Sequence, residues 1–202
     1  MTRLFGTDGV RGKANRELTP QMAFDLGKAG AFYLSKGEAG SFFVIGKDTR
    51  LSGDMLEGAL IAGINSVGGD VIRAGVITTP GIACVTKELG ATGGVMISAS
   101  HNPFDDNGIK FFNSGGFKLD DAEEEEIEAL YFNSLQGLPC PVGDCVGSEK
   151  RVANPAELYL SFLKKAAGTS FTGMRVVLDC ANGAAYRLAP RLFRELGARV
   201  EV

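Results

Sequence analysis

Apolar positions along the chain alternate between helical and strand-like spacing. A helix of about 16 residues is predicted after Thr19-Pro20, where a capping side chain is followed by proline at the first helical position, and it should end before Gly37. The run SFFVIG (41–46) is continuously apolar and lies between glycines, which is typical of a strand buried on both faces of a sheet. The first elements are therefore a helix and a buried strand.

The same alternation continues to the end of the chain. Further helices are predicted over 55–67, from Thr79-Pro80 to near Gly90, over 120–132, from Asn154-Pro155 through Ala166 and over 188–196, and further strands over 70–77, 93–98, 108–113, the start of 175–185 and 198–202. Alternating elements of this kind are typical of layered α/β proteins, and strands that are mostly buried favour parallel pairing. We therefore expect a layered α/β/α domain with a mixed, largely parallel sheet.

Residues 134–153 contain Gly and Pro with little periodicity and are predicted to form a connection. We expect a first domain over 1–153 and the incomplete beginning of a second, similar α/β domain over 154–202. A lone βαβ piece buries too little surface to be stable by itself. The chain is therefore expected to be a domain-scale piece or part of a longer protein.

Composition narrows the classes of function. The chain has 202 residues with 45% hydrophobic and 22% charged residues, and its apolar runs are far shorter than a membrane span. Its opening, MTRLFGTDG, lacks the apolar segment of a secretory signal, so we expect a cytoplasmic protein without membrane association. The net charge of −3 argues against nucleic-acid binding. The four cysteines form no Cys-x-x-Cys pair, which argues against a structural zinc site.

Three stretches combine glycine and small residues with charged groups where strands should end. They are FGTDGVRG (5–12), GKDTRLSG (46–53) and SASHNPFDDNGIK (98–110). Ligands of open α/β sheets gather outside the carboxyl ends of the strands, so these loops should meet at one site. Together they would supply Arg11, Lys47, Arg50, His101 and Lys110. Such a local cationic set in an acidic chain favours a phosphorylated small molecule.

The stretch 98–108 has a simple structural interpretation as well as a catalytic one. Asn-Pro and Asn-Gly are common turn dipeptides, and Asp105 and Asp106 are best interpreted as turn residues. A serine-protease-like triad is disfavoured because Ser100 and His101 are sequence neighbours. Phosphoryl transfer through a serine requires less side-chain machinery, because positioning and cations do most of the work.

The motif SASHNPFDDNGIK resembles the active-site signature of the α-D-phosphohexomutase family. LFGTDGVRG together with MISASHNP resembles the branch that acts on glucosamine phosphates, and GKDTRLSG and LDCANGAA match the family in their expected order. The resemblance covers essentially the whole chain. It implies an isomerase that interconverts glucosamine 6-phosphate and glucosamine 1-phosphate for cell-wall precursor synthesis, through a phosphoserine and a bisphosphorylated sugar.

The resemblance also implies roles for particular residues. The implied catalytic residues are Ser100, His101, Lys110 and Arg11, and the implied phosphate-binding residues are Arg11, Lys47, Arg50 and Asn102. Mg²⁺ would bind through the phosphate on Ser100, with its other ligands outside this chain. Ser98 is expected to be structural. Two alternatives stay open: Lys110 transfers a proton or only neutralises phosphate, and Lys47 and Arg50 shape the pocket or only pair with Asp48 and Asp54.

The chain departs from the family in lacking its metal-binding, sugar-recognition and distal phosphate-binding loops. We therefore expect the chain alone to be inactive as a mutase. Two alternatives to the glucosamine activity are a phosphohexomutase acting on glucose or mannose phosphates, and a non-catalytic module whose Ser100 stays unphosphorylated. The resemblance is compatible with a homodimer.

Overall fold

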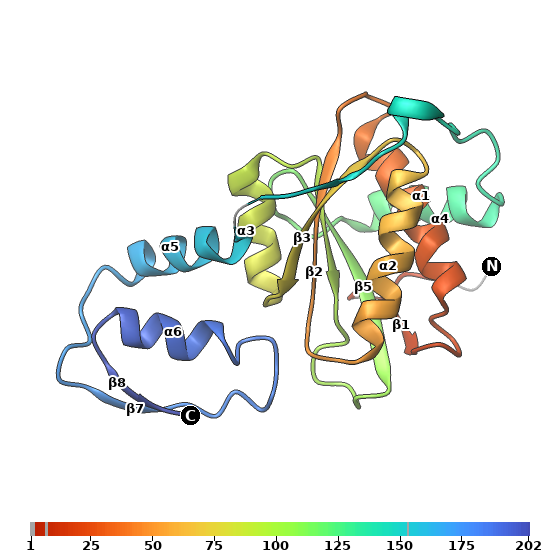
Figure 1. Ribbon diagram of the computed structural model, residues 1–202. Coiled ribbons are helices and arrows are strands. Elements are labelled where there is room, and N and C mark those ends of the chain that lie inside the picture. The colour runs from red at the N-terminus through yellow and green to blue at the C-terminus, as the bar shows by residue number, and fades with distance from the viewer. Residues whose placement is uncertain (1–2, 7, 153) are drawn as a thin grey trace.

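The computed structural model describes residues 3–6, 8–152 and 154–202. Thr7 of the first glycine-rich stretch and Ala153 at the expected domain boundary lie outside the described residues. Figure 1 shows a twisted central sheet with helices on both sides, and a smaller group of elements near the C-terminus. The expected layered α/β/α architecture is confirmed.

The central sheet has six strands. They are β1 (Val10–Lys13), β2 (Phe42–Lys47), β3 (Asp70–Val76), β4 (Gly93–Ile97), β5 (Asp106–Asn113) and β6 (Glu149–Lys150), in the spatial order β1-β5-β4-β2-β3-β6. Strands β4, β2, β3 and β6 are parallel to their neighbours in this row, whereas β5 pairs antiparallel with both β4 and β1. The sheet is therefore mixed and largely parallel, as predicted.

Helices cover both faces of this sheet. One face packs against α1 (Pro20–Ser35), α2 (Ser52–Asn65) and α4 (Asp121–Phe132), and the other against α3 (Thr79–Leu89) and α5 (Pro155–Ala167). The two layers explain why residues 42–45 of β2 are all apolar: Phe43 and Ile45 pack into the first layer and Val44 into the second. Full burial of each such side chain stabilises the fold by about 1.5–3 kcal/mol.

Local sequence signals set the helix ends. The Thr19 hydroxyl accepts a hydrogen bond from the Met22 N–H at 3.1 Å, and Pro20 occupies the first turn. At the start of α4, Asp120 and Glu123 form a reciprocal capping box. For α3 the cap is Thr78, one residue earlier than the Thr79-Pro80 signal suggested, and Gly90 ends the helix with a φ of +65°. These ends therefore agree closely with the predicted ones.

The C-terminal residues form β7 (Arg175–Val177), α6 (Leu188–Glu195) and β8 (Arg199–Glu201). Strands β7 and β8 pair in parallel as a separate two-stranded sheet. Leu160 of α5 and Leu188 of α6, however, join the same apolar cluster as α3. The C-terminal elements therefore share core with the first sheet, and a domain boundary near 153 stays a prediction.

Two strands of the central sheet were not predicted. Strand β1 overlaps the end of the expected loop 5–12, and β6 lies inside the expected connection 134–153. Neither has an apolar alternation, since β1 reads VRGK and β6 has two exposed residues. Both are edge strands, which form because a neighbouring strand offers free backbone groups. Strand β5 also starts earlier than predicted, at Asp106.

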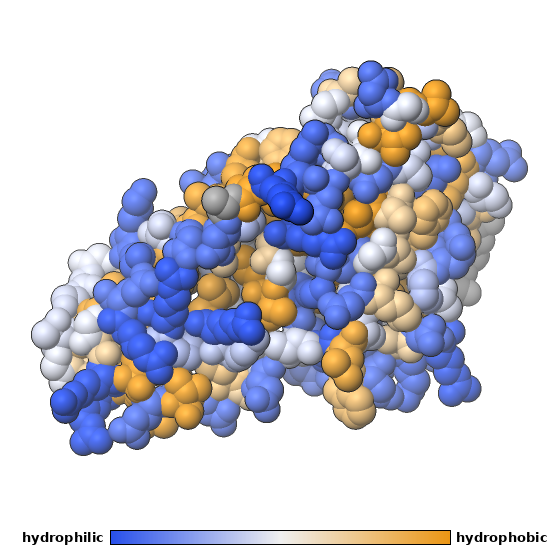
Figure 2. Space-filling model, in the orientation of Figure 1, coloured by the Kyte–Doolittle hydropathy of each residue, from blue (hydrophilic) through white to orange (hydrophobic). Residues whose placement is uncertain are grey.

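The surface of the molecule is mixed in character. On the face shown in Figure 2, apolar residues appear as small separate groups among hydrophilic ones. No helix in the described part of the chain has the length and apolar character needed to cross a membrane.

Helices α1 and α2 cross at very close range. A Cβ at Gly27 would lie 2.6 Å from the Leu60 carbonyl oxygen, and one at Gly63 would overlap the Phe24 carbonyl oxygen. In both cases the obstacle is backbone, which cannot move aside as a flexible side chain could. The two helices therefore depend on glycine at their contact.

Gly63→Ala is expected to lower the free energy of unfolding by about 2 kcal/mol, because overpacking of this kind forces backbone shifts. The matched control is Gly58→Ala, in the same helix but exposed, where an added Cβ meets nothing within 4 Å. That change should raise the free energy of unfolding by about 0.5–1 kcal/mol through helix propensity. Urea unfolding of the two variants measures both effects, and equal midpoints would contradict the close crossing.

Candidate active site

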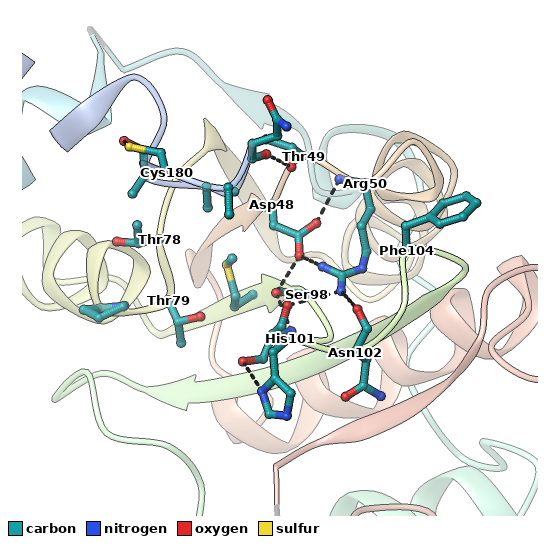
Figure 3. A pocket seen from close by; sticks show the side chains of 18 of the residues that line it. Asp48, Thr49, Arg50, Thr78, Thr79, Ser98, His101, Asn102, Phe104 and Cys180 are labelled. Atoms are coloured by element: carbon teal, nitrogen blue, oxygen red, sulfur yellow. Dashed lines mark hydrogen bonds and ion pairs between the residues drawn. The ribbon is translucent and has the colours of Figure 1, made fainter. Parts of the chain in front are cut away.

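A cleft of about 880 Å³ lies at the carboxyl ends of the parallel strands. Its walls come from the segments 48–51 after β2, 78–80 after β3, 98–104 after β4 and 180–185 after β7. Two of the three glycine-rich stretches singled out in the sequence, 46–53 and 98–110, therefore meet there. Figure 3 shows their side chains on one wall, opposite Thr78, Thr79 and Cys180.

Ser100 lies at the exposed tip of the loop after β4. Its φ is +57°, in the left-handed region that non-glycine residues seldom adopt. That conformation costs about 1–2 kcal/mol, so the surrounding contacts must stabilise it. A strained, exposed serine in a cleft points to function rather than to an ordinary turn.

The loop around Ser100 is held from beneath by a buried polar network. The Ser98 hydroxyl accepts the Ser100 N–H at 3.0 Å and donates to Asp48 Oδ2 at 2.6 Å. Asp48 also forms an ion pair with Arg50. Ser98 is 6% exposed, so its role is structural, as the sequence suggested. The sequence indicated Asp48 only as a possible ion-pair partner of Lys47 or Arg50, and its hydrogen bond to the base of the Ser100 loop was not predicted.

His101 and Asn102 complete the tip of the loop (Figure 3). The Nδ1 atom of His101 lies 3.5 Å from the Ser100 Oγ, at the outer limit of a hydrogen bond. The Asn102 N–H donates to the Ala99 carbonyl and closes the turn, while its side chain donates to Asp106 at 3.0 Å. Both residues line the cleft.

Arg11 and Lys110 lie together, beside the cleft rather than in its lining. Asp8 accepts from both, with its Oδ1 at 2.6 Å from Lys110 Nζ. The hydrogen bond from Lys110 lowers the pKa of the Asp8 carboxyl below its ordinary value. Asp8 was not among the predicted site residues, although it lies within the stretch FGTDGVRG.

Two glycines allow these side chains to approach the Ser100 loop. Gly9 has a φ of +87°, and a Cβ there would lie 2.8 Å from the Lys110 Cγ. A Cβ at Gly108 would lie 2.7 Å from the Ser98 carbonyl oxygen and 3.0 Å from the Arg11 Cγ. The Arg11 stem therefore lies next to the base of the loop that carries Ser100.

Lys47 is directed away from the cleft. Its Nζ lies 2.5 Å from Asp54 and 2.6 Å from Glu57, a carboxylate that is only 2% exposed. Burial lowers the pKa of the Lys47 ammonium, but the hydrogen bonds to these carboxylates outweigh it, so that its pKa is raised. Arg50, by contrast, both pairs with Asp48 and lines the cleft.

Asp105 and Asp106 take part in turn contacts. Asp105 pairs with Lys13 at 2.8 Å, and the Asp106 N–H donates to the Pro103 carbonyl.

Within residues 3–6, 8–152 and 154–202, no three His, Cys, Asp or Glu side chains group closely enough to hold a metal ion. Phosphorylation of Ser100 would place oxygen ligands for a hard cation in the cleft.

The far wall of the cleft is the turn 180–185. Ala181 and Asn182 both have positive φ values, of +47° and +53°. The Thr49 hydroxyl donates to the Asn182 carbonyl at 2.6 Å, which ties this turn to the segment that carries Asp48 and Arg50. The LDCANGAA motif thus reaches the same site as the Ser100 loop.

Comparison with known proteins identifies the family of this chain. A family model described as phosphoglucomutase/phosphomannomutase, α/β/α domain I, matches residues 2–137. The chain belongs to this family. The matched region contains the Ser100 loop, β1 with Arg11, and β5 with Lys110.

Relatives within the family extend over the rest of the chain. A protein of Heliobacterium modesticaldum named phosphoglucosamine mutase is 55% identical over 99% of this chain and 47% of its own length. One of Pelotomaculum thermopropionicum with the same name is 54% identical over 98% of this chain and 44% of its own length. The structure of a phosphoglucomutase/phosphomannomutase family protein from Burkholderia thailandensis superposes with a TM-score of 0.82 at 25% identity, covering 100% of this chain and 43% of that one. The chain therefore spans less than half the length of these relatives.

Asp8→Asn tests the charge cluster through its pH dependence. A carboxyl whose pKa is lower in the folded state contributes stability above its unfolded pKa and loses it as the pH falls through the folded pKa. The variant should therefore be less stable than wild type by about 0.5–1 kcal/mol at neutral pH, the upper end of the range for exposed ion pairs, because the Asp8 side chain is 46% exposed. That difference should shrink as the pH falls below the ordinary Asp value of 3.8.

Urea unfolding at a series of pH values measures this difference. Glu125→Gln serves as the control, because Glu125 is exposed and forms no ion pair with the described residues. A difference for Asp8→Asn that is the same at every pH would contradict the role of the Asp8 charge.

Proposed function

We propose that this chain is the phosphoserine-bearing part of a phosphoglucosamine mutase, a cytoplasmic enzyme that interconverts glucosamine 6-phosphate and glucosamine 1-phosphate. The observation that carries the proposal is Ser100 itself: an exposed serine with a φ of +57° at the tip of a loop fixed from beneath by Ser98, Asp48 and Arg50. The names of relatives about 54% identical to the chain support the choice of sugar.

In the proposed reaction, phosphorylated Ser100 gives its phosphoryl group to the free hydroxyl of a sugar monophosphate. The bond from phosphorus to Ser100 Oγ breaks as a bond to the sugar oxygen forms, and the hydroxyl proton passes to a base. The bisphosphorylated sugar then turns round and returns its other phosphoryl group to Ser100 Oγ, and the sugar oxygen that loses this group takes up the proton from the base. No net phosphate is consumed, so the reaction is an isomerisation.

The chain's own residues can supply positioning and charge for these steps. The ammonium of Lys110 and the guanidinium of Arg11 are held side by side by Asp8, and the Arg11 Nε is buried with no partner among the described residues. Cations placed in this way neutralise the charge of a transferring phosphoryl group. Because Lys110 is paired with a carboxylate, we assign it to neutralisation. His101, 3.5 Å from Ser100 Oγ, is the group best placed to hold a proton there.

Mg²⁺ is the cofactor that this proposal implies. When bound, it neutralises the non-bridging oxygens of the phosphoserine, which are hard ligands of the kind that this ion prefers. The phosphate on Ser100 is the ligand that this chain would provide. The remaining ligands would come from the part of the longer protein that the relatives contain beyond this match.

The first test is the phosphorylation state of Ser100. Peptide mass spectrometry of the purified protein, after incubation with a hexose bisphosphate and Mg²⁺, is expected to find one phosphate on Ser100 and none on a Ser100→Ala variant. The control is Ser114→Ala, which removes an exposed serine outside the cleft lining and should leave the phosphate on Ser100 unchanged. Absence of phosphate at Ser100 in a mutase-active protein would refute the proposal.

A further inference from the structure

Arg50 donates its hydrogen bonds to other groups of the protein. Its Nη1 pairs with Asp48, and its Nη2 donates to the carbonyl oxygens of Ser100 at 3.2 Å and Asn102 at 2.7 Å. A guanidinium has five N–H groups in a fixed fork. Three hydrogen bonds therefore already attach the Arg50 guanidinium to Asp48 beneath the Ser100 loop and to two carbonyl groups at the tip of that loop.

The burial of Arg50 points in the same direction. Its side chain is 11% exposed and that of Asp48 is 7% exposed. The Arg50 Nε is buried and has no hydrogen-bond partner among the described residues. A bidentate grip on a phosphate needs two adjacent, accessible N–H groups, which Arg50 could offer only by releasing the loop.

The two peptide groups that flank the Ser100 Cα are both connected to the Asp48 carboxylate, each through one intervening side chain. On one side, the Ser100 N–H donates to Ser98 Oγ, which donates to Asp48. On the other side, the Ser100 carbonyl accepts from Arg50, which pairs with Asp48. These contacts fix the φ of +57° that directs Ser100 Oγ into the cleft.

We propose that Arg50 is a positioning residue for phosphoryl transfer, which holds Ser100 through two loop carbonyls and does not itself bind the substrate phosphate. The inference rests on the proposed function of Ser100. It differs from the phosphate-binding role that the family resemblance implied for Arg50. Lysine cannot replace it, because a single ammonium lacks the planar fork that reaches Asp48 and both carbonyls together.

The test compares Arg50→Lys with wild type in the complete protein. Because a misplacement of about 1 Å costs about 100-fold in rate, kcat should fall about 100-fold while KM stays within about 3-fold. The control is Arg73→Lys, which keeps a cation beside Glu57 and Glu149 and lies outside the cleft lining. Its kcat should stay within about 2-fold of wild type, as expected for surface substitutions.

A second readout measures the loop without any turnover. Amide hydrogen exchange over residues 98–103, followed by mass spectrometry, is expected to be about 10-fold faster in Arg50→Lys than in wild type, because local opening becomes easier. Ser98→Ala removes the hydrogen bond that the Ser100 N–H donates to Ser98 Oγ. This variant should therefore show both the loss of kcat and the faster exchange. If Arg50→Lys does not fold, Ser98→Ala still tests whether the Asp48 network that includes Arg50 positions Ser100.

The outcomes separate this inference from the proposed function. A raised KM with kcat near the wild-type value would show that Arg50 binds substrate, and unchanged kinetics would equally overturn the positioning role. Unchanged exchange over 98–103 in both variants overturns it whether or not the protein turns over. Absence of phosphoryl transfer from Ser100 in wild type would instead refute the proposed function.

Discussion

One buried carboxylate, Asp48, joins two of the loops that form the cleft. It accepts from Ser98 at the base of the Ser100 loop and pairs with Arg50, which in turn reaches the loop's tip. A buried carboxylate without partners would be strongly destabilising, so the loops can close around it only with Ser98 and Arg50 in place. The geometry of Ser100 thus depends on a charge located at the end of a different strand.

Parallel pairing of β2 and β4 brings these loops together. Because parallel strands end at the same edge of the sheet, the residues after Lys47 and after Ile97 emerge as neighbours. Strand β5 then returns antiparallel beside β4 and places Lys110 on the sheet next to the loop's base. Gly9 and Gly108 allow the long side chains of Lys110 and Arg11 to cross the backbone there.

The cations of the site are all paired within the chain. Asp8 holds Arg11 and Lys110, Asp48 holds Arg50, and Glu57 with Asp54 holds Lys47. Pairing of this kind keeps partly buried charges from being destabilising and orients them before a ligand arrives. The pairing also gives these cations different positions and roles. Arg11 and Lys110 lie beside the cleft, Arg50 fixes the Ser100 loop, and Lys47 forms a structural ion pair.

The sequence by itself determined most of the helices and strands and the location of the Ser100 loop. The continuous apolar run of β2, the Thr19-Pro20 start of α1 and the SASHNP loop after β4 are local signals, because each depends on residues close together in the chain. Features that depend on contacts between distant parts of the chain were decided only by the tertiary structure. The edge strands β1 and β6 exist only through their neighbours, and Lys47 and Arg50, three residues apart in one motif, point to different partners. The roles of Asp8 and Asp48 likewise arise from contacts between distant segments, since a carboxylate's function depends on which charges the fold places beside it.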